Sequence, residues 1–157
     1  MSILVNTLLF LAAFTGMELV AYLTHKYLMH GPLWSLHESH HVPQEGPLEK
    51  NDLFGLFFAI PSIVLIWVGT RWFPPALWIG LGMTAYGAAY FIFHDVIVHR
   101  RVKLGYKPHG GYLQRITQAH RMHHATRGRE GAVSFGFLYA PPLERLKAER
   151  ETARATR

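Results

Sequence analysis

Histidine is the residue type in this chain whose number and spacing could do chemistry. The chain has 11 histidines in 157 residues, and ten of them fall into four short clusters. The clusters have two spacings, H-x4-H and H-x2-H-H, and this pair of spacings occurs twice in the same order. The clustered residues are His25, His30, His37, His40, His41, His94, His99, His120, His123 and His124. Two repeated sets of five imidazoles indicate a site for two metal ions.

The spacing within each cluster determines how its rings are presented. On a helix, residues three and four apart share one face, so the three imidazoles of an H-x2-H-H cluster can converge on metal. Rings five residues apart point about 140° away from each other. An H-x4-H pair therefore chelates one ion only if the helix is distorted; otherwise it reaches two ions or lies across the mouth of a site. His109, outside the clusters, lies in a Gly- and Pro-rich loop, and we expect it to be structural.

Other histidine-based sites fit the sequence less well. His37 to His41 matches the metalloprotease string H-E-x-x-H, but that site would leave most of the clustered histidines unused. A carboxylate di-iron bundle needs Glu-x-x-His on two helices, and the second H-x2-H-H cluster has Arg121 in the place of that glutamate. The 157 residues contain no cysteine, which excludes thiolate ligands. Imidazole binds iron, zinc, copper and nickel, so the ligand type alone does not choose the metal. Five nitrogens per ion exceed the four ligands that zinc prefers and would leave an iron with open positions for O2.

Three apolar segments must position these histidines. Residues 3–23, 53–70 and 76–93 carry a single charged side chain, that of Glu18. About 20 helical residues cross the roughly 30 Å hydrocarbon core of a membrane. We therefore expect an all-α integral membrane protein with three transmembrane helices and a histidine-rich helical cap. The near-absence of charge argues against the alternative, three buried helices of a soluble protein. At this length, residues 1–157 are expected to form a single domain.

Local signals mark the ends of these segments. Residues 70–75 are too few for anything but a tight turn, which makes the second and third spans a hairpin. Asn51 and Asp52 offer an N-cap for the second span, and Gly31 with Pro32 ends the helix that leaves the first. The first segment lacks the basic start of a signal peptide, so we expect it to remain as a helix. All four histidine clusters then lie at one membrane face.

Basic residues predict the orientation of the chain. Arg71 is in the turn between the second and third spans, and the other 15 of the 16 Lys and Arg residues are on the histidine side. By the positive-inside rule, the histidines and the C-terminal tail, which is basic from about residue 100, should face the cytoplasm. The tail could attract an acidic electron donor or anionic lipid headgroups. We expect no nucleic-acid partner.

Two acidic residues are candidates for supporting the ligands without binding metal. Asp95 lies four residues before His99 and could accept the second N–H of that ring, which would fix its tautomer. Glu18 lies seven residues before His25, nearly in line with it and two turns deeper in the membrane. An acid at that depth is expected to make a structural or functional polar contact.

Together with the histidines, several segments resemble the membrane-bound di-iron fatty acid hydroxylase superfamily, and within it the bacterial β-carotene hydroxylases. All ten histidines of the family pattern have a counterpart here, and the resemblance extends to about Lys147. The stretch 133–142 resembles the carotenoid branch in particular. The other segments that carry the resemblance are residues 17–18, 25–31, 49–53, 83–87 and 119–125.

The resemblance implies a specific reaction, carotenoid ring hydroxylation at C3 and C3′ of β-ionone rings, which turns β-carotene into β-cryptoxanthin and then zeaxanthin. It implies two iron ions (Fe2+), O2, a lipid-dissolved carotenoid, and the bacterial inner membrane as location. Because the chain has no G-x-G-x-x-G motif and no cysteine, electrons must come from a separate donor, by resemblance a reduced ferredoxin. The alternatives are a fatty-acyl or sterol hydroxylase or desaturase, a membrane metal-binding protein, and a bis-histidine haem carrier.

Overall fold

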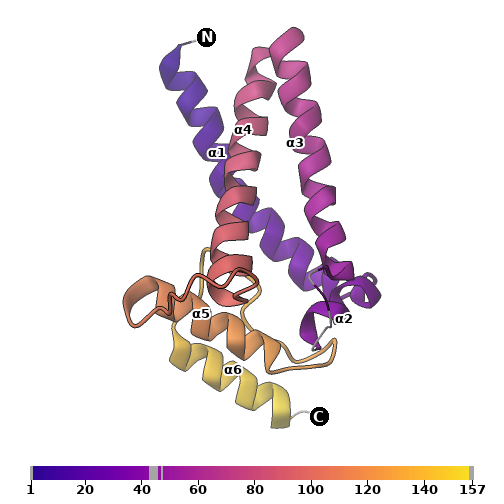
Figure 1. The fold of residues 1–157 in the computed structure, drawn as a ribbon, viewed down its shortest axis with the longest axis vertical. Helices are drawn as coiled ribbons and strands as arrows, with labels where there is room; N and C mark the ends of the chain where they lie inside the picture. The colour runs from indigo at the N-terminus through magenta and orange to yellow at the C-terminus, as the bar shows by residue number, and fades with distance from the viewer. Residues whose placement is uncertain (1, 43–45, 47, 156–157) are drawn as a thin grey trace.

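The computed structural model describes residues 2–42, 46 and 48–155, and all regular elements in these ranges are helices. Three long helices extend away from a layer of shorter helices, with the N-terminus at the far end and the C-terminus in the layer (Figure 1). The α-helices are α1 (Ile3–Leu23), α2 (Trp34–His41), α3 (Leu53–Arg71), α4 (Pro74–Tyr90), α5 (Gly111–His124) and α6 (Leu143–Ala155). The predicted all-α class is confirmed.

Three helical segments are long and apolar enough to cross a membrane: Ile3–Met29, Lys50–Arg71 and Pro74–Val98. They confirm the three predicted spans, and each extends further toward the histidines than predicted. The first and third continue as the π-helices η1 (Thr24–Met29) and η3 (Phe91–Val98), and the second begins with the 3-10 turn η2 (Lys50–Asp52). Integration into a membrane follows from the length and composition of these helices.

The long helices pack closely through small residues. α4 contacts both α1 and α3. A Cβ atom added at Gly82 would lie 2.4 Å from the Phe10 carbonyl oxygen of α1, so only glycine permits this approach. On the other side of α4, the Ser62 hydroxyl donates to the Gly80 carbonyl at 2.9 Å. The outward faces of these helices carry large exposed apolar side chains such as Ile63, as expected for contact with lipid.

The second span has Asp52 at its N-cap position, as predicted, but the capping hydrogen bond differs from the prediction. Neither predicted residue caps α3 with its side chain. Instead, Asp52 Oδ2 accepts from the Glu49 backbone N–H at 2.9 Å and caps the 3-10 turn that precedes α3. The Asn51 side chain faces a histidine of α2. The predicted hairpin is present, because only Trp72 and Phe73 separate α3 from α4.

Candidate metal centre

The ten clustered histidines meet where the spans join the layer of short helices, and nine of them form two groups. In each group, one ring nitrogen per residue lies within 4.8 Å of all the others. The five-histidine group consists of His25, His30, His37, His41 and His123; the four-histidine group consists of His40, His94, His99 and His120. The tenth, His124, adjoins the latter, with its Nε2 atom 2.8 Å from His120 Nε2. His109 is exposed and belongs to neither group.

Membership of the groups does not follow the sequence repeat. In α2, His37 joins one group with His41, whereas His40 joins the other. In α5, His123 leaves its sequence neighbours in the same way and joins the group of His37. Residues four apart on a helix differ by only about 40° in direction, while the residue three away points about 60° to the other side. The three imidazoles of each H-x2-H-H cluster are therefore divided between the two groups.

Each H-x4-H pair stays in one group because its helix is distorted. The His30 N–H donates to the His25 carbonyl at 3.0 Å, and the His99 N–H donates to the His94 carbonyl at 2.9 Å. These are the five-residue bonds of a π-helix, a conformation that is often found at functional sites. The wider turn brings residues five apart onto one side. The distortion that chelation by an H-x4-H pair requires is therefore present in η1 and in η3.

In the five-histidine group, every Nδ1 atom faces a carbonyl oxygen at 2.7 to 3.0 Å. The main-chain oxygens of Phe135, Arg129, Thr126 and Val133 lie against His25, His30, His41 and His123 respectively, and the side-chain oxygen of Asn51 lies against His37. A carbonyl oxygen only accepts hydrogen bonds, so each Nδ1 must carry the hydrogen. A neutral imidazole has a single N–H, which leaves a lone pair on every Nε2.

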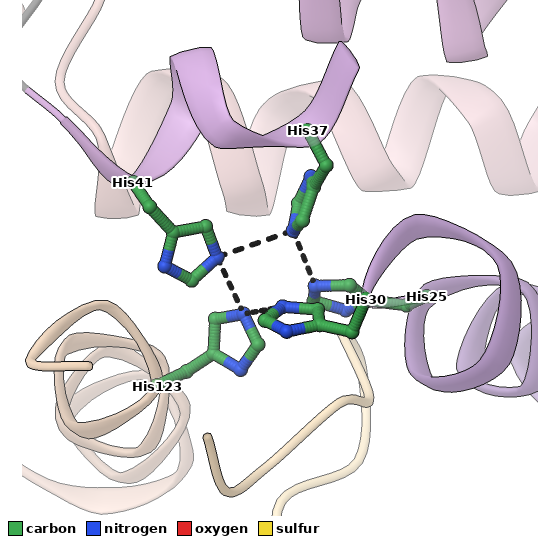
Figure 2. Close-up of side chains that lie close together, drawn as sticks. All are labelled: His25, His30, His37, His41 and His123. Atoms are coloured by element: carbon green, nitrogen blue, oxygen red, sulfur yellow. Dashed lines mark hydrogen bonds between the residues drawn. The ribbon is translucent and has the colours of Figure 1, made fainter. Parts of the chain in front are cut away.

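These Nε2 lone pairs point at one another. Four Nε2–Nε2 contacts of 3.1 to 3.2 Å link the five rings, as the dashed lines of Figure 2 show. They cannot be hydrogen bonds, because neither partner has a hydrogen to donate. Two nitrogens bound at right angles about 2.1 Å from an ion lie about 3 Å apart. The donor set therefore fits a metal ion held by imidazole nitrogens.

Burial keeps these imidazoles neutral. His37 and His123 are 1% and 0% exposed. Loss of hydration lowers the pKa of His37 to about 3 and that of His41 to about 4, and it places the pKa of His123 well below the usual value of 6.5. At neutral pH the lone pairs are therefore free of protons and available to a metal ion.

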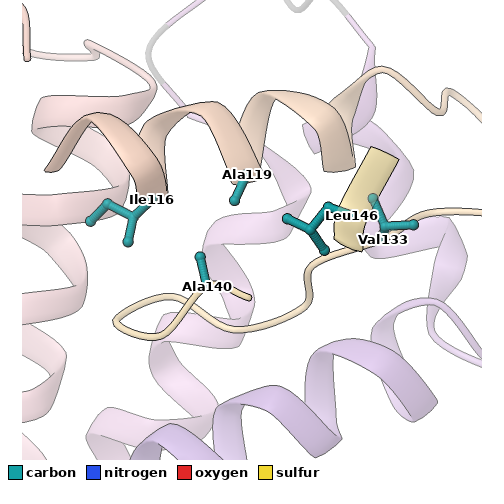
Figure 3. Close-up of a cluster of buried hydrophobic side chains, with 5 residues drawn as sticks. All are labelled: Ile116, Ala119, Val133, Ala140 and Leu146. Carbon is teal, nitrogen blue, oxygen red and sulfur yellow. The ribbon is translucent and has the colours of Figure 1, made fainter. Parts of the chain in front are cut away.

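A hydrophobic core fixes the rotation of α5, which supplies His120, His123 and His124. Ile116 and Ala119 of α5 pack on Leu146 of α6 and on Val133 and Ala140 of the connecting segment (Figure 3). His120 follows Ala119 directly and is itself 5% exposed. Because this apolar face is buried, the rotation of α5 about its axis is fixed. In that rotation the histidines of α5 point into the two groups.

The four-histidine group has different surroundings. Its Nε2 atoms approach one another at 3.1 Å between His40 and His94 and at 2.8 Å between His99 and His120. The His40 Nδ1–H donates to the Glu49 carboxylate at 2.8 Å. Burial lowers the pKa of His99 to about 4, and it also lowers the pKa values of His40 and His120. This group is therefore also neutral at pH 7, but a carboxylate supports one of its rings.

Both predicted supporting acids make polar contacts: Glu18 as expected, and Asp95 with other residues than the predicted His99. Asp95 Oδ1 lies 3.4 Å from His94 Nδ1, not against the predicted His99, and it accepts from Arg101 at 3.2 Å. The π-helical turn changes the alignment of residues four apart, which displaces His99 from Asp95. Glu18 accepts from the Tyr86 hydroxyl at 2.7 Å and from the backbone N–H groups of residues 137–139. It anchors the segment that supplies the Phe135 carbonyl and so acts at a distance from the rings.

Sequence reasoning missed most of the groups that orient the rings. Glu49 and Asn51 had a visible signal, since both are polar and lie directly before an apolar span at the histidine face. The four main-chain carbonyls of the segment from Thr126 to Phe135 have no signal in the sequence. Every residue has a carbonyl, so residue types do not show which carbonyls face the rings. Their arrangement requires Ser134 in the left-handed region, at φ 62°, between two carbonyls that both face histidines.

We expect metal-free protein to lose stability in weak acid. The folded-state pKa values of His37, His41 and His99 lie below the usual 6.5, so the unfolded chain binds more protons between pH 6.5 and about 4. The free energy of unfolding should have its full value above pH 6.5. Below pH 6.5 it should fall by up to ~1.4 kcal/mol per pH unit for each histidine that titrates. Thermal denaturation of chelator-treated protein in micelles at pH 7.5 and 5.5 measures this. Equal midpoints at the two pH values would contradict it.

Comparisons with known proteins identify the family. A model described as "Fatty acid hydroxylase" matches residues 10–146. A protein named "Beta-carotene hydroxylase" from Pantoea ananas is 54% identical over 153 residues, which cover 96% of this chain and 87% of that protein. Another of that name, from Paracoccus sp. (strain N81106 / MBIC 01143), is 52% identical and covers 92% of this chain and 90% of its own length. No solved structure gives a significant match. The chain belongs to the fatty acid hydroxylase family.

Proposed function

We propose that this protein is a carotenoid hydroxylase that introduces hydroxyl groups at C3 and C3′ of β-ionone rings and converts β-carotene through β-cryptoxanthin to zeaxanthin. The observation that carries the proposal is the pair of all-imidazole groups at the end of three membrane-length helices. The similarity to proteins named for β-carotene supports the choice of substrate. Such a substrate dissolves in the hydrocarbon core, which the exposed apolar faces of the long helices would contact.

The proposed cofactors are two iron ions. The five-histidine group would hold one, and the four-histidine group with His124 would hold the other. Bound iron would supply the activation of O2 that replacement of an unactivated C–H bond requires. The residues of the chain keep Nδ1 of the five-histidine group and of His40 protonated, turn the Nε2 atoms inward and bury the rings. This preorganisation spares the protein a rearrangement on metal binding.

The reaction also needs a source of electrons. One atom of O2 enters the product and the other leaves as water, which consumes two electrons and two protons. The chain contains no cysteine to hold an iron–sulfur cluster, so we propose a separate reduced ferredoxin as donor. The stretch after His99 has 13 basic and four acidic residues, and its charge would attract an acidic partner. We propose that residues 1–157 act as one domain in the bacterial inner membrane.

A fatty-acyl or sterol substrate is the rival proposal, because the matching family is described by fatty acid hydroxylation. Expression in a bacterium that accumulates β-carotene, followed by pigment chromatography, separates the two. We expect zeaxanthin to appear, with β-cryptoxanthin as intermediate. A His123→Ala variant should leave the pigment unchanged. Unchanged β-carotene in cells whose purified wild-type protein contains two irons would favour the rival substrate, and a protein without metal would contradict both.

We further propose that the histidines face the cytoplasm. Fifteen basic residues lie on their side of the membrane and one, Arg71, lies in the opposite turn. Fusions of a reporter that is active only in the periplasm should be active at Arg71 and silent after Arg157, a residue outside the described ranges. The reverse pattern would contradict this orientation and the access of a cytoplasmic donor.

A further inference from the structure

The two histidine groups differ in the charge of the atoms behind their rings. Neutral carbonyl oxygens accept from all five Nδ1–H groups of the five-histidine group. In the four-histidine group, the Glu49 carboxylate accepts from His40 at 2.8 Å, and the Asp95 carboxylate lies 3.4 Å from His94 Nδ1. The described hydrogen bonds place no carboxylate on any ring of the five-histidine group.

The carboxylates of the four-histidine group belong to a larger charged cluster. Arg101 joins Asp95 at 3.2 Å and Asp52 at 2.7 Å, and Asp52 accepts from the backbone N–H of Glu49. Three carboxylates and one guanidinium leave a net formal charge of −2. The side chains of Glu49 and Asp95 are only 18% and 11% exposed, so water screens this charge weakly. The cluster therefore produces a weakly screened negative electrostatic potential beside the four-histidine group.

A carboxylate behind a histidine changes how that histidine binds metal. It polarises the Nδ1–H bond and increases the electron density on Nε2, which raises the basicity of the ligand. The negative charge also attracts the cation directly through a partly buried medium. A carbonyl oxygen holds the ring in the same orientation but adds no net charge. Hydrogen bonds to Nδ1 orient all five rings of the five-histidine group and His40 of the four-histidine group. Tighter binding by the four-histidine group would therefore come from its negative charge.

We propose that the four-histidine group is the tighter of the two metal positions and that Glu49, acting through His40, is the positioning residue that makes it so. The inference rests on the proposed metal centre but not on hydroxylation. It predicts that the first equivalent of a divalent ion fills the four-histidine group. In a centre with one ferrous and one ferric ion, the ferric ion should occupy this group, because the higher charge gains more from the carboxylates.

The chain offers a matched pair of variants for this test. Glu49→Gln keeps an oxygen that accepts from His40 and removes the charge. Asn51→Asp keeps the oxygen that accepts from His37, at 2.7 Å in the wild type, and adds a charge to the five-histidine group. The first change should weaken the tighter step of metal binding by about 10- to 100-fold. The second should strengthen the weaker step, so both variants should bring the two affinities together from opposite directions.

Calorimetric titration of metal-free protein in micelles with Co2+ provides the measurement. We expect two steps for the wild type that differ at least tenfold in affinity. His94→Ala should remove the tighter step, and His123→Ala should remove the weaker one. Circular dichroism checks that each variant is folded. If Glu49→Gln fails to fold, the titration of Asn51→Asp provides the test.

The outcomes separate this inference from the proposed function. A wild-type protein that binds no Co2+ would overturn the metal centre itself. Two steps of equal affinity, or steps that neither Glu49→Gln nor Asn51→Asp shifts, would overturn the inference and leave the metal centre in place. Loss of the tighter step in His123→Ala instead of His94→Ala would show that the five-histidine group binds first, which also overturns it.

Discussion

Alanine at any of the ten clustered histidines should reduce hydroxylation by more than about 100-fold, because loss of groups that merely support metal ligands already costs about 10- to 100-fold. Each of the ten contributes a ring nitrogen to one of the two groups or adjoins one. Pigment conversion in cells and iron content of the purified variants measure the effect. His109→Ala is the control and should behave as wild type, since His109 is exposed in a loop.

The same series distinguishes the two groups. His37→Ala and His40→Ala alter neighbouring positions of one motif, yet they should remove different ions, because the two rings face different groups. Iron content should fall from two per chain toward one in each case, and the double variant should lose both. If the double variant still holds one iron, or if several of the ten prove dispensable while His109 is essential, the assignment of ligands is wrong.

The sequence predicted the parts of this structure that depend on composition and local periodicity. Three long apolar segments gave three helices near their predicted limits, and the residues at 72 and 73 separate the two helices of the hairpin. The clustering of histidines at one end followed from those limits alone. Asp52 stands at the predicted N-cap position of α3, but its side chain accepts from the backbone of Glu49 and that of Asn51 faces His37. Such choices depend on neighbours that local sequence does not reveal.

The distribution of histidines between the groups could not be predicted for the same reason. On a helical wheel, His40 lies close enough to His37 and His41 for all three to share an ion. The orientation of α2 between two groups decides otherwise, and that orientation depends on packing against the spans. The π-helices are a second example. Nothing in the sequence from Thr24 to Met29 requires a five-residue bond, although the H-x4-H spacing fits one.

The exchange of histidines links the two halves of the chain. His40 comes from the first repeat and joins the group built mainly by the second, while His123 does the reverse. Neither half can therefore assemble a complete group by itself. The segment that contains Arg129 and Phe135 also orients His30 and His25 of the first half. Metal binding should consequently stabilise the contact between the halves as well as the individual sites.

The second large effect concerns electrons and oxygen. Purified protein with NADPH and O2 alone should produce no hydroxylated carotenoid, because the chain lacks cysteines and a nucleotide-binding glycine motif. Addition of a ferredoxin and its reductase should start turnover, with one O2 consumed for each hydroxyl formed. The rate should fall as salt is raised, because screening limits the reach of the basic tail to about 8 Å at physiological ionic strength.

Isotope labelling tests the origin of the hydroxyl oxygen. With 18O2 in ordinary water, the reconstituted system should give zeaxanthin that carries 18O in both hydroxyl groups. A reaction in H218O under ordinary O2 is the matched control and should give unlabelled product. Glu49→Gln alters the group that accepts from His40. This variant should slow turnover without altering the source of oxygen. A hydroxyl oxygen derived from water would rule out the proposed use of O2, whichever metal the histidines hold.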